Sequence, residues 1–256
     1  MEVIMNKLRK CIGFFLISCA IICLILAFLQ LQKYEKGNEE YQKIEEKNTN
    51  QSNTEEPDDF SVDWESLAKQ NPDCVGWIRM DPSVSYPIVQ GNSNKEYLHK
   101  GFNGAYNING TIFMHYQNSA DWTDKNTVIY GHNMINGSMF GNNDKYKNKA
   151  YAEKHPYFYI YTPQGRYTYK IFDTIIANDA TYPYELNLFT ENDFATYLKK
   201  MDKMKLYGLD VPVSAKDRIV TLSTCTSHGK KRFIIQGVLD SYRNEIGKTY
   251  IRNSNI

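Results

Sequence analysis

The first thirty residues contain the longest apolar run of the chain. No residue from Cys11 to Leu29 is charged, and three basic residues (Lys7, Arg9 and Lys10) come just before the run. As a helix this run would extend for about 28 Å, close to the ~30 Å hydrocarbon core of a bilayer. The pattern predicts a cytoplasmic segment at 1–10 and an uncleaved transmembrane signal anchor at 11–30.

Two other interpretations of the run stay open. A cleaved signal peptide would have a shorter apolar region ending in a small-residue site, which Ala27-Phe28-Leu29 does not supply. Leu16-Ile17-Ser18-Cys19 resembles a bacterial lipobox that would lipidate Cys19, but the apolar run continues for ten residues beyond it. Lysines also follow the run, so charge alone favours a cytoplasmic N-terminus only weakly.

A polar, acidic segment comes after the anchor. Between Gly37 and Asp59 eight carboxylates stand against two lysines, and residues 48–53 include no apolar side chain. This composition predicts a solvated stalk over 31–59, helical near the membrane and disordered later.

Short runs rich in β-branched and aromatic residues begin after Phe60. We expect a short amphipathic helix at 61–69 and a longer helix after Thr190, whose side chain is a good N-cap. Pro163-Gln164-Gly165 predicts a hairpin turn. Eight strands are expected near 76–80, 85–90, 111–115, 127–131, 157–162, 166–178, 218–225 and 232–239. The predicted fold class is mainly β, with residues 60–256 forming a closed or nearly closed eight-stranded barrel with a few peripheral helices, preceded by one transmembrane helix.

Composition excludes several classes of protein. Thirty Lys and Arg residues balance 29 Asp and Glu residues, which argues against a nucleic-acid binder. Hydrophobic residues make up 42%, enough for a buried core, so the chain as a whole is not disordered. Three of the five cysteines lie in the apolar run, which excludes a disulfide scaffold. No metal site and no cofactor are predicted, because paired Cys or His spacing and glycine-rich phosphate motifs are missing.

Cys225 is a candidate nucleophile. It ends one predicted strand, and Arg232 opens the next, with six residues between them. In an antiparallel pair the two would lie side by side at one rim, where a guanidinium can favour a thiolate and hold an oxyanion. The alternative is a buried structural cysteine beside a surface arginine, and spacing alone favours that alternative.

A cysteine nucleophile needs an acid or base partner, and three histidines are candidates. His132 follows the apolar strand Val128-Ile129-Tyr130-Gly131 and would emerge at a strand end. His115 ends another predicted strand, and His228 lies in the loop beside Cys225. The spacing does not rank the three.

Several motifs, taken in order, resemble those of the sortases, the cysteine transpeptidases of Gram-positive cell surfaces. Thr221-Leu222-Ser223-Thr224-Cys225 is similar to the TLxTC signature, residues 126–134 are similar to the segment with the family's histidine, and Arg232 matches the family's arginine. Segments 62–67, 71–78, 86–91, 94–98 and 110–114, and the helix at 191–206, resemble the class B branch. Cys74 and His115 depart from the family pattern, where an aliphatic residue and an aspartate are common.

The resemblance implies a sortase-like barrel with its active site at one rim, outside the cell. It implies that Cys225 attacks a Thr carbonyl in the C-terminal sorting signal of a surface protein, that Arg232 holds the carbonyl oxygen, and that His132 exchanges the proton. The thioacyl group would pass to an amine of a peptidoglycan precursor. Asn94, Leu98, Tyr130 and Ser223 match positions that line the substrate groove of class B enzymes. A peptidase that only hydrolyses and a non-catalytic anchored surface domain remain alternatives.

Overall fold

A single sheet, which closes on itself, forms the body of the molecule. The computed structural model describes residues 2–50, 59–80, 82–177, 182–225 and 231–252. The strands in these ranges are β1 (Cys74–Met80), β2 (Val84–Val89), β3 (Ile112–Met114), β4 (Asn126–Tyr130), β5 (Tyr157–Thr162), β6 (Gly165–Ala177), β7 (Ile219–Cys225), β8 (Arg232–Asn244) and β9 (Thr249–Ile251). All eight predicted strands are confirmed, whereas β9 and the last five residues of β8 were not predicted.

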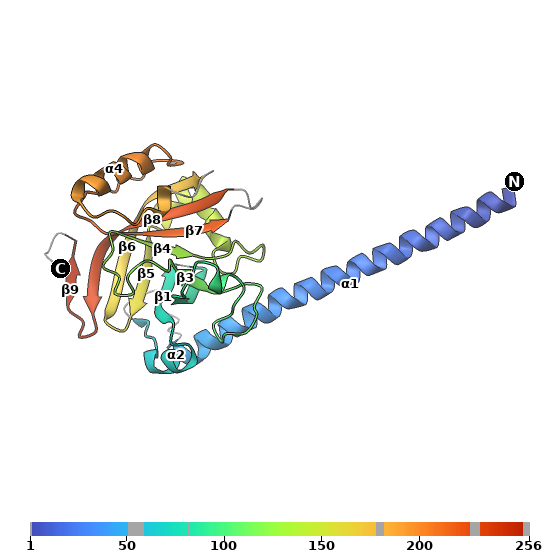
Figure 1. The fold of residues 1–256 in the computed structure, drawn as a ribbon, viewed down its shortest axis with the longest axis horizontal. Helices are drawn as coiled ribbons and strands as arrows, with labels where there is room; N and C mark the ends of the chain where they lie inside the picture. The colour runs from blue at the N-terminus through green and yellow to red at the C-terminus, as the bar shows by residue number, and fades with distance from the viewer. Residues whose placement is uncertain (1, 51–58, 81, 178–181, 226–230, 253–256) are drawn as a thin grey trace.

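The strand order is β6-β5-β1-β2-β3-β4-β7-β8, and pairing of β6 with β8 completes the ring (Figure 1). β2 with β3 and β4 with β7 are parallel, and the other pairings are antiparallel. Because closure leaves β6 and β8 without a free edge along most of their length, the predicted closed eight-stranded barrel is confirmed. β9 extends the sheet beyond β8 as an outer strand.

Helices cover the barrel on its outside. They are α2 (Trp64–Gln70), α3 (Lys149–Lys154) and α4 (Glu191–Asp202), with 3-10 turns η2 (Glu96–Leu98), η3 (Gly141–Lys147) and η4 (Tyr182–Tyr184). α4 begins at the expected cap, where Thr190 and Asp193 form a capping box. Its apolar face, with Phe194, Tyr197 and Met201 buried, covers β6, β7 and β8 and makes a second core outside the barrel. The helix expected after Thr190 is confirmed.

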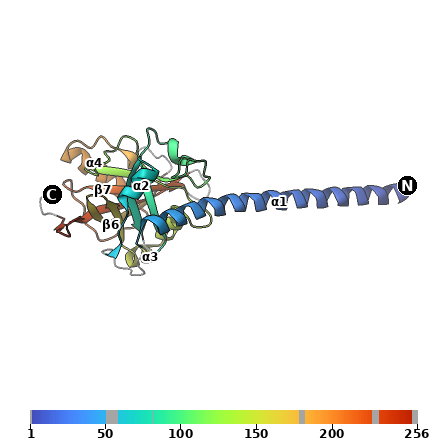
Figure 2. The same cartoon turned by 90° about the horizontal axis from the view of Figure 1, so that it is seen from below.

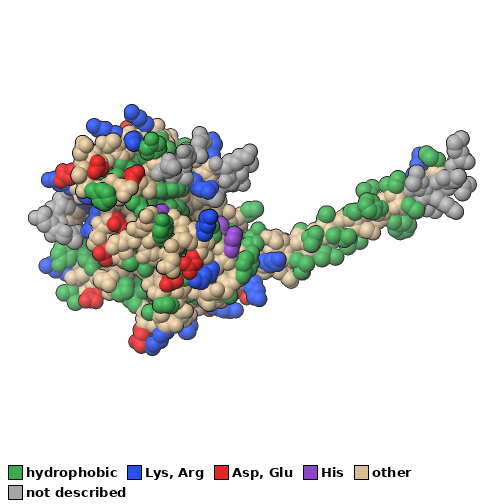
Figure 3. Space-filling model, in the orientation of Figure 1, with side chains coloured by type: hydrophobic (Ala, Val, Ile, Leu, Met, Phe, Trp, Pro, Cys, Tyr) green, Lys and Arg blue, Asp and Glu red, His purple; other side chains and the backbone are tan. Residues whose placement is uncertain are grey.

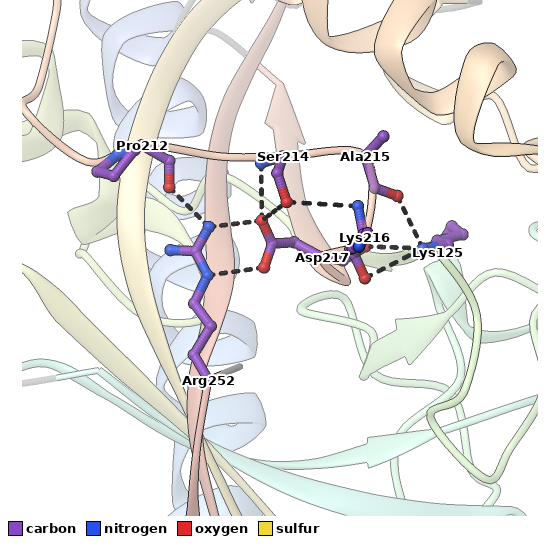
Figure 4. Close-up of polar contacts among 7 residues, drawn as sticks. All are labelled: Lys125, Pro212, Ser214, Ala215, Lys216, Asp217 and Arg252. Carbon is purple, nitrogen blue, oxygen red and sulfur yellow. Dashed lines mark hydrogen bonds and ion pairs between the residues drawn. The ribbon is translucent and has the colours of Figure 1, made fainter. Parts of the chain in front are cut away.

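A polar clasp fixes the start of β7 (Figure 4). Asp217, two residues before the strand, accepts two bonds from Arg252 at 2.6 and 2.7 Å. Lys125 donates to the carbonyl of Ala215 at 2.9 Å and to the two carbonyls that follow. Although burial by itself raises the pKa of Asp217, the bonds from Arg252 and Ser214 hold that pKa below its usual value. The clasp therefore ties the end of β9 and the segment before β4 to the strand that ends at Cys225.

The N-terminal helix α1 (Glu2–Asn48) is continuous from the apolar run to the barrel (Figures 1 and 2). Among the described residues it is the one helix long and apolar enough to cross a membrane, and hydrophobic side chains coat its projecting part (Figure 3). Its last three turns differ from the expected solvated stalk. Gly37, Tyr41, Ile44 and Asn48 form a stripe at helical spacing that is buried against the barrel. Residues 51–58 of the expected stalk lie outside the described part.

Gly237 provides a test of the barrel interior. A Cβ placed there would lie 2.3 Å from an edge carbon of Phe158 and 3.0 Å from the Cβ of Tyr169, whose rings stack at 5.2 Å. We expect Gly237→Ala to lower the free energy of unfolding by about 1–3 kcal/mol, because the stacked rings must shift. Urea denaturation followed by tryptophan fluorescence measures this change.

The matched control is Gly208→Ala, where the nearest atom lies 4.0 Å away and the position is exposed. Its unfolding midpoint should match that of the parent chain. Equal stabilities for the two variants would contradict the close packing of Phe158 against β8.

Candidate active site

Three strand ends meet at one edge of the barrel. β4 runs parallel to β7 with Tyr130 opposite Ser223, and β7 runs antiparallel to β8 with Cys225 opposite Arg232. The parallel ladder continues by one residue beyond β4, where the next amide donates to the carbonyl of Ser223 at 3.1 Å. His132 comes next in the chain, immediately beyond the end of this ladder. Cys225 and Arg232 are therefore paired at this edge, and His132 follows the strand that pairs with β7 on its other side.

A buried polar network fixes this alignment. The side-chain amide of Asn126 in β4 accepts from Thr221 of β7 at 2.7 Å. Gln236 of β8 donates to Thr221 at 2.9 Å and to the hydroxyl of Tyr197 in α4 at 2.6 Å. All four side chains are buried, so a shift of one strand by one residue would leave polar atoms without partners. The network therefore determines which residues end the strands together.

The same network places a further residue beside the edge. Asn126 also donates to the carbonyls of Pro183 and Glu185 at 3.0 and 3.1 Å, which holds the η4 turn against the sheet. Tyr184 in this turn hydrogen-bonds with the Ser223 hydroxyl, and its ring meets the Tyr130 ring edge-on at 5.4 Å. Tyr184 could not be predicted from the sequence, because its turn has no motif and is placed by contacts with residues far away in the chain, such as Asn126 and Tyr197.

His132 is held by a backbone carbonyl. Its Nε2 lies 2.6 Å from the carbonyl oxygen of Leu98, and because a carbonyl only accepts, Nε2 carries the proton. In the neutral imidazole this leaves Nδ1 with the lone pair that can exchange a proton. The carbonyl of His132 accepts from the amide of Phe140 at 3.0 Å, which fixes the backbone of the following loop.

A second imidazole stacks on His132. The ring of His99 lies 5.4 Å from that of His132 at an angle of 19°, and His99 is exposed whereas His132 is half-buried. Burial lowers the pKa of His132, the bond to Leu98 opposes this, and the charge of His99 lowers it further. The neutral form of His132 is therefore favoured.

Arg232 and Tyr130 are close enough to interact electrostatically. Burial and Tyr184 raise the pKa of Tyr130, while the positive charge of Arg232 opposes this rise. Arg232 is itself half-buried. The side chain of Cys225 and the whole of His228, the third histidine candidate, lie outside the described residues.

The predicted groove residues lie either on the paired strands β4 and β7 or on the segment around η2. Tyr130 and the buried Ser223 lie side by side on paired strands at this edge. Leu98, at the end of η2, reaches the site through its carbonyl bond to His132. Asn94 lies before η2, where its side-chain oxygen accepts from the amide of Tyr116 at 3.1 Å.

The two departures from the family pattern have structural roles. His115 is buried, stacks on Tyr116 at 5.1 Å and accepts from the amide of Gln117 through Nδ1 at 3.2 Å. Burial lowers the pKa of His115. Cys74 is a free thiol whose Sγ–H points to the carbonyl of Gly76 at 3.7 Å, and burial raises its pKa to about 12. Such a thiol is almost entirely protonated at neutral pH and is a poor nucleophile.

No group of three or more His, Cys, Asp and Glu side chains in the described ranges could hold a metal ion.

Comparisons with known proteins point to one family. Residues 79–240 match the model of the sortase domain family. Sortase B of Listeria monocytogenes is 40% identical over 177 residues, which cover 68% of this chain and 72% of the relative. A crystal structure of sortase B from B. anthracis, described as a complex with AAEK1, has a TM-score of 0.71 and 30% identity, covering 82% of this chain and 98% of that one. A Staphylococcus aureus sortase B–substrate complex has a TM-score of 0.66 and 28% identity, covering 83% and 97%.

The stacking of His99 on His132 predicts a measurable shift in the pKa of His132. We expect His99→Gln to raise the pKa of His132, because the positive charge of His99 would no longer repel the positive charge that His132 gains on protonation. NMR titration of ¹⁵N-histidine-labelled full-length protein in detergent micelles measures the pKa of the His132 imidazole directly.

As a control, His155→Gln removes a histidine at the end of α3 and should leave the titration of His132 unchanged. An unchanged or lowered pKa of His132 in His99→Gln would contradict the electrostatic coupling of the two rings.

Proposed function

The chain belongs to the sortase family, and on that premise we propose that it is a membrane-anchored class B transpeptidase that joins surface proteins to the cell wall. Sortase B enzymes are cysteine transpeptidases, and the match covers most of the barrel. In this proposal the substrate is a surface protein with a C-terminal sorting signal. The acceptor is an amine of a peptidoglycan precursor.

The register at the barrel edge is the observation that carries the proposal. Cys225 is opposite Arg232 in the β7–β8 ladder, and His132 follows the strand that pairs with β7 on its other side. A nucleophile, a cation and a proton-exchanging imidazole on three adjacent strand ends can act on one peptide bond.

The proposed reaction has two steps. The thiolate of Cys225 attacks the carbonyl carbon of the substrate threonine, and Arg232 stabilises the negative charge that develops on the carbonyl oxygen. His132, neutral at rest, takes the thiol proton of Cys225 on Nδ1, the nitrogen that Leu98 does not hold, and gives that proton to the leaving amine as the C–N bond breaks. An acceptor amine then loses a proton to His132 and attacks the thioester, which forms the new amide and returns the thiolate.

We assign the walls of the substrate groove to residues around this edge. Tyr130 and Tyr184 meet edge-on there and offer an aromatic surface, while the buried hydroxyl of Ser223 is bonded to that of Tyr184. Leu98 adds an apolar, half-buried side chain. The oxygen of Asn94 is already bonded to Tyr116, so its amide N–H groups would face the peptide.

The proposed location follows from the apolar helix. The span at 11–30 would anchor the protein by a single pass, with residues 1–10 in the cytoplasm and the barrel outside the cell. The site would then lie on the side of the membrane where the cell wall is built. Membrane lipid is therefore a proposed partner of the anchor.

The decisive test is transfer to an amine. Full-length protein in detergent micelles should cleave a fluorogenic sorting-signal peptide from a library with fixed threonine, and added triglycine should convert the product into the amide. Cys225→Ala should abolish both reactions, because the thioester cannot form. Arg232→Ala should lower kcat/KM by about 10²-fold or more.

Cys74→Ala is the matched control. It removes the other thiol near the barrel, one that is half-buried and protonated, and should keep the activity of the parent chain. Retained transfer in Cys225→Ala would overturn the assignment. Cleavage that ignores triglycine and yields only the free acid would mean that the enzyme is a peptidase.

A further inference from the structure

Tyr41 of α1 lies at the centre of the contact between the N-terminal helix and the barrel. Its side chain is 3% exposed. Its hydroxyl donates to the carbonyl of Gly110 and lies 2.8 Å from the hydroxyl oxygen of Thr111. Its ring meets the ring of Tyr86 edge-on at 5.5 Å. Tyr41 thus contacts two separate segments of the barrel.

The first segment leads to the carbonyl that holds the imidazole. Thr111 donates through its hydroxyl to the carbonyl of Lys100 at 2.8 Å and through its amide to that of Tyr97 at 3.0 Å. Leu98 lies between these residues in sequence. Gly110 abuts it directly, since a Cβ built on Gly110 would lie 2.5 Å from the carbonyl oxygen of Leu98. This is the oxygen that accepts from Nε2 of His132.

The second segment leads to the backbone of the same histidine. The hydroxyl of Tyr86 accepts from the amide of Met139 at 3.1 Å. Met139 bridges to Asn133, and the next amide, that of Phe140, donates to the carbonyl of His132 at 3.0 Å. The loop that carries His132 is therefore fastened to the residue on which the Tyr41 ring packs.

We propose that Tyr41 is a positioning residue for His132, through which the docked anchor helix holds both the imidazole and its loop in place. The proposal rests on the proposed function, because it takes His132 to be the group that exchanges protons with substrate. The hydroxyl and the ring of Tyr41 have separate roles. The hydroxyl of Tyr41 supports the Leu98 carbonyl, whereas its ring supports the loop through Tyr86.

The test replaces Tyr41 with phenylalanine in the full-length chain. Tyr41→Phe keeps the ring on Tyr86 but removes the bonds to Gly110 and Thr111. We expect kcat for peptide cleavage to fall about tenfold or more while KM changes less than about twofold, because a displaced acid–base group slows chemistry more than binding. The pKa of His132, read by NMR, should fall, since the bond to Leu98 is what raises it.

A second variant and a matched control separate positioning from simple loss of stability. Thr111→Val removes the hydroxyl between Tyr41 and Lys100 and should lower kcat and the pKa of His132 in the same direction. Tyr34→Phe makes the same chemical change two turns earlier on α1 and should leave both unchanged. If Tyr41→Phe does not fold, Thr111→Val carries the test.

A lower melting temperature with parental kcat and an unchanged pKa of His132 would overturn the positioning role. That result, together with complete loss of transfer in Cys225→Ala, would leave the proposed function standing. Retained transfer in Cys225→Ala would instead remove the proposed function itself.

Discussion

The paired register of β4, β7 and β8 is the constraint on which the rest of the molecule depends. A β-ladder has a repeat of two residues, so a slip by one residue turns every side chain to the other face. Here a slip would separate Asn126, Thr221 and Gln236 inside the sheet and would also misalign the strand ends at the edge. Each buried polar group left without a partner would cost about 1–3 kcal/mol. The free energy that holds the strands in register is therefore the same free energy that aligns the candidate catalytic residues.

The structure separates the work of the barrel from that of its surroundings. The closed sheet provides a rigid edge, because β6 and β8 pair along their length and neither is free to shift. The residues that support the edge from outside, directly or through their neighbours, come from turns and a helix. Tyr184 arrives on η4, Leu98 on η2 and Tyr41 on α1. The strands thus determine the backbone positions of the candidate catalytic residues, while the attached turns and helix hold their side chains.

The sequence predicts the strands well, because alternation and turn residues are local signals, and the capping box at Thr190 is equally local. The positions of Cys225 and Arg232 could be predicted as neighbours, since a short loop between two strands fixes their pairing. The docking of α1 could not, because the buried stripe of Gly37, Tyr41, Ile44 and Asn48 stands among charged residues that dominate the composition. Tyr184 and the Leu98 carbonyl were also out of reach. Both depend on contacts between segments far apart in the chain, and a backbone carbonyl has no sequence signature.

The continuity of α1 has a geometric consequence for the whole molecule. The described helix has no break between its apolar segment and the turns that grip the barrel, so the two parts share one axis and one angular setting. Each residue of an α-helix advances by 1.5 Å and rotates by about 100°. Inserting or deleting a single residue between 30 and 36 would therefore move the barrel by only about 1.5 Å along the helix axis. It would, however, rotate the edge where β4, β7 and β8 end by about 100° around that axis. In this protein the number of residues in the connecting turns therefore determines the direction in which that edge faces around the helix axis.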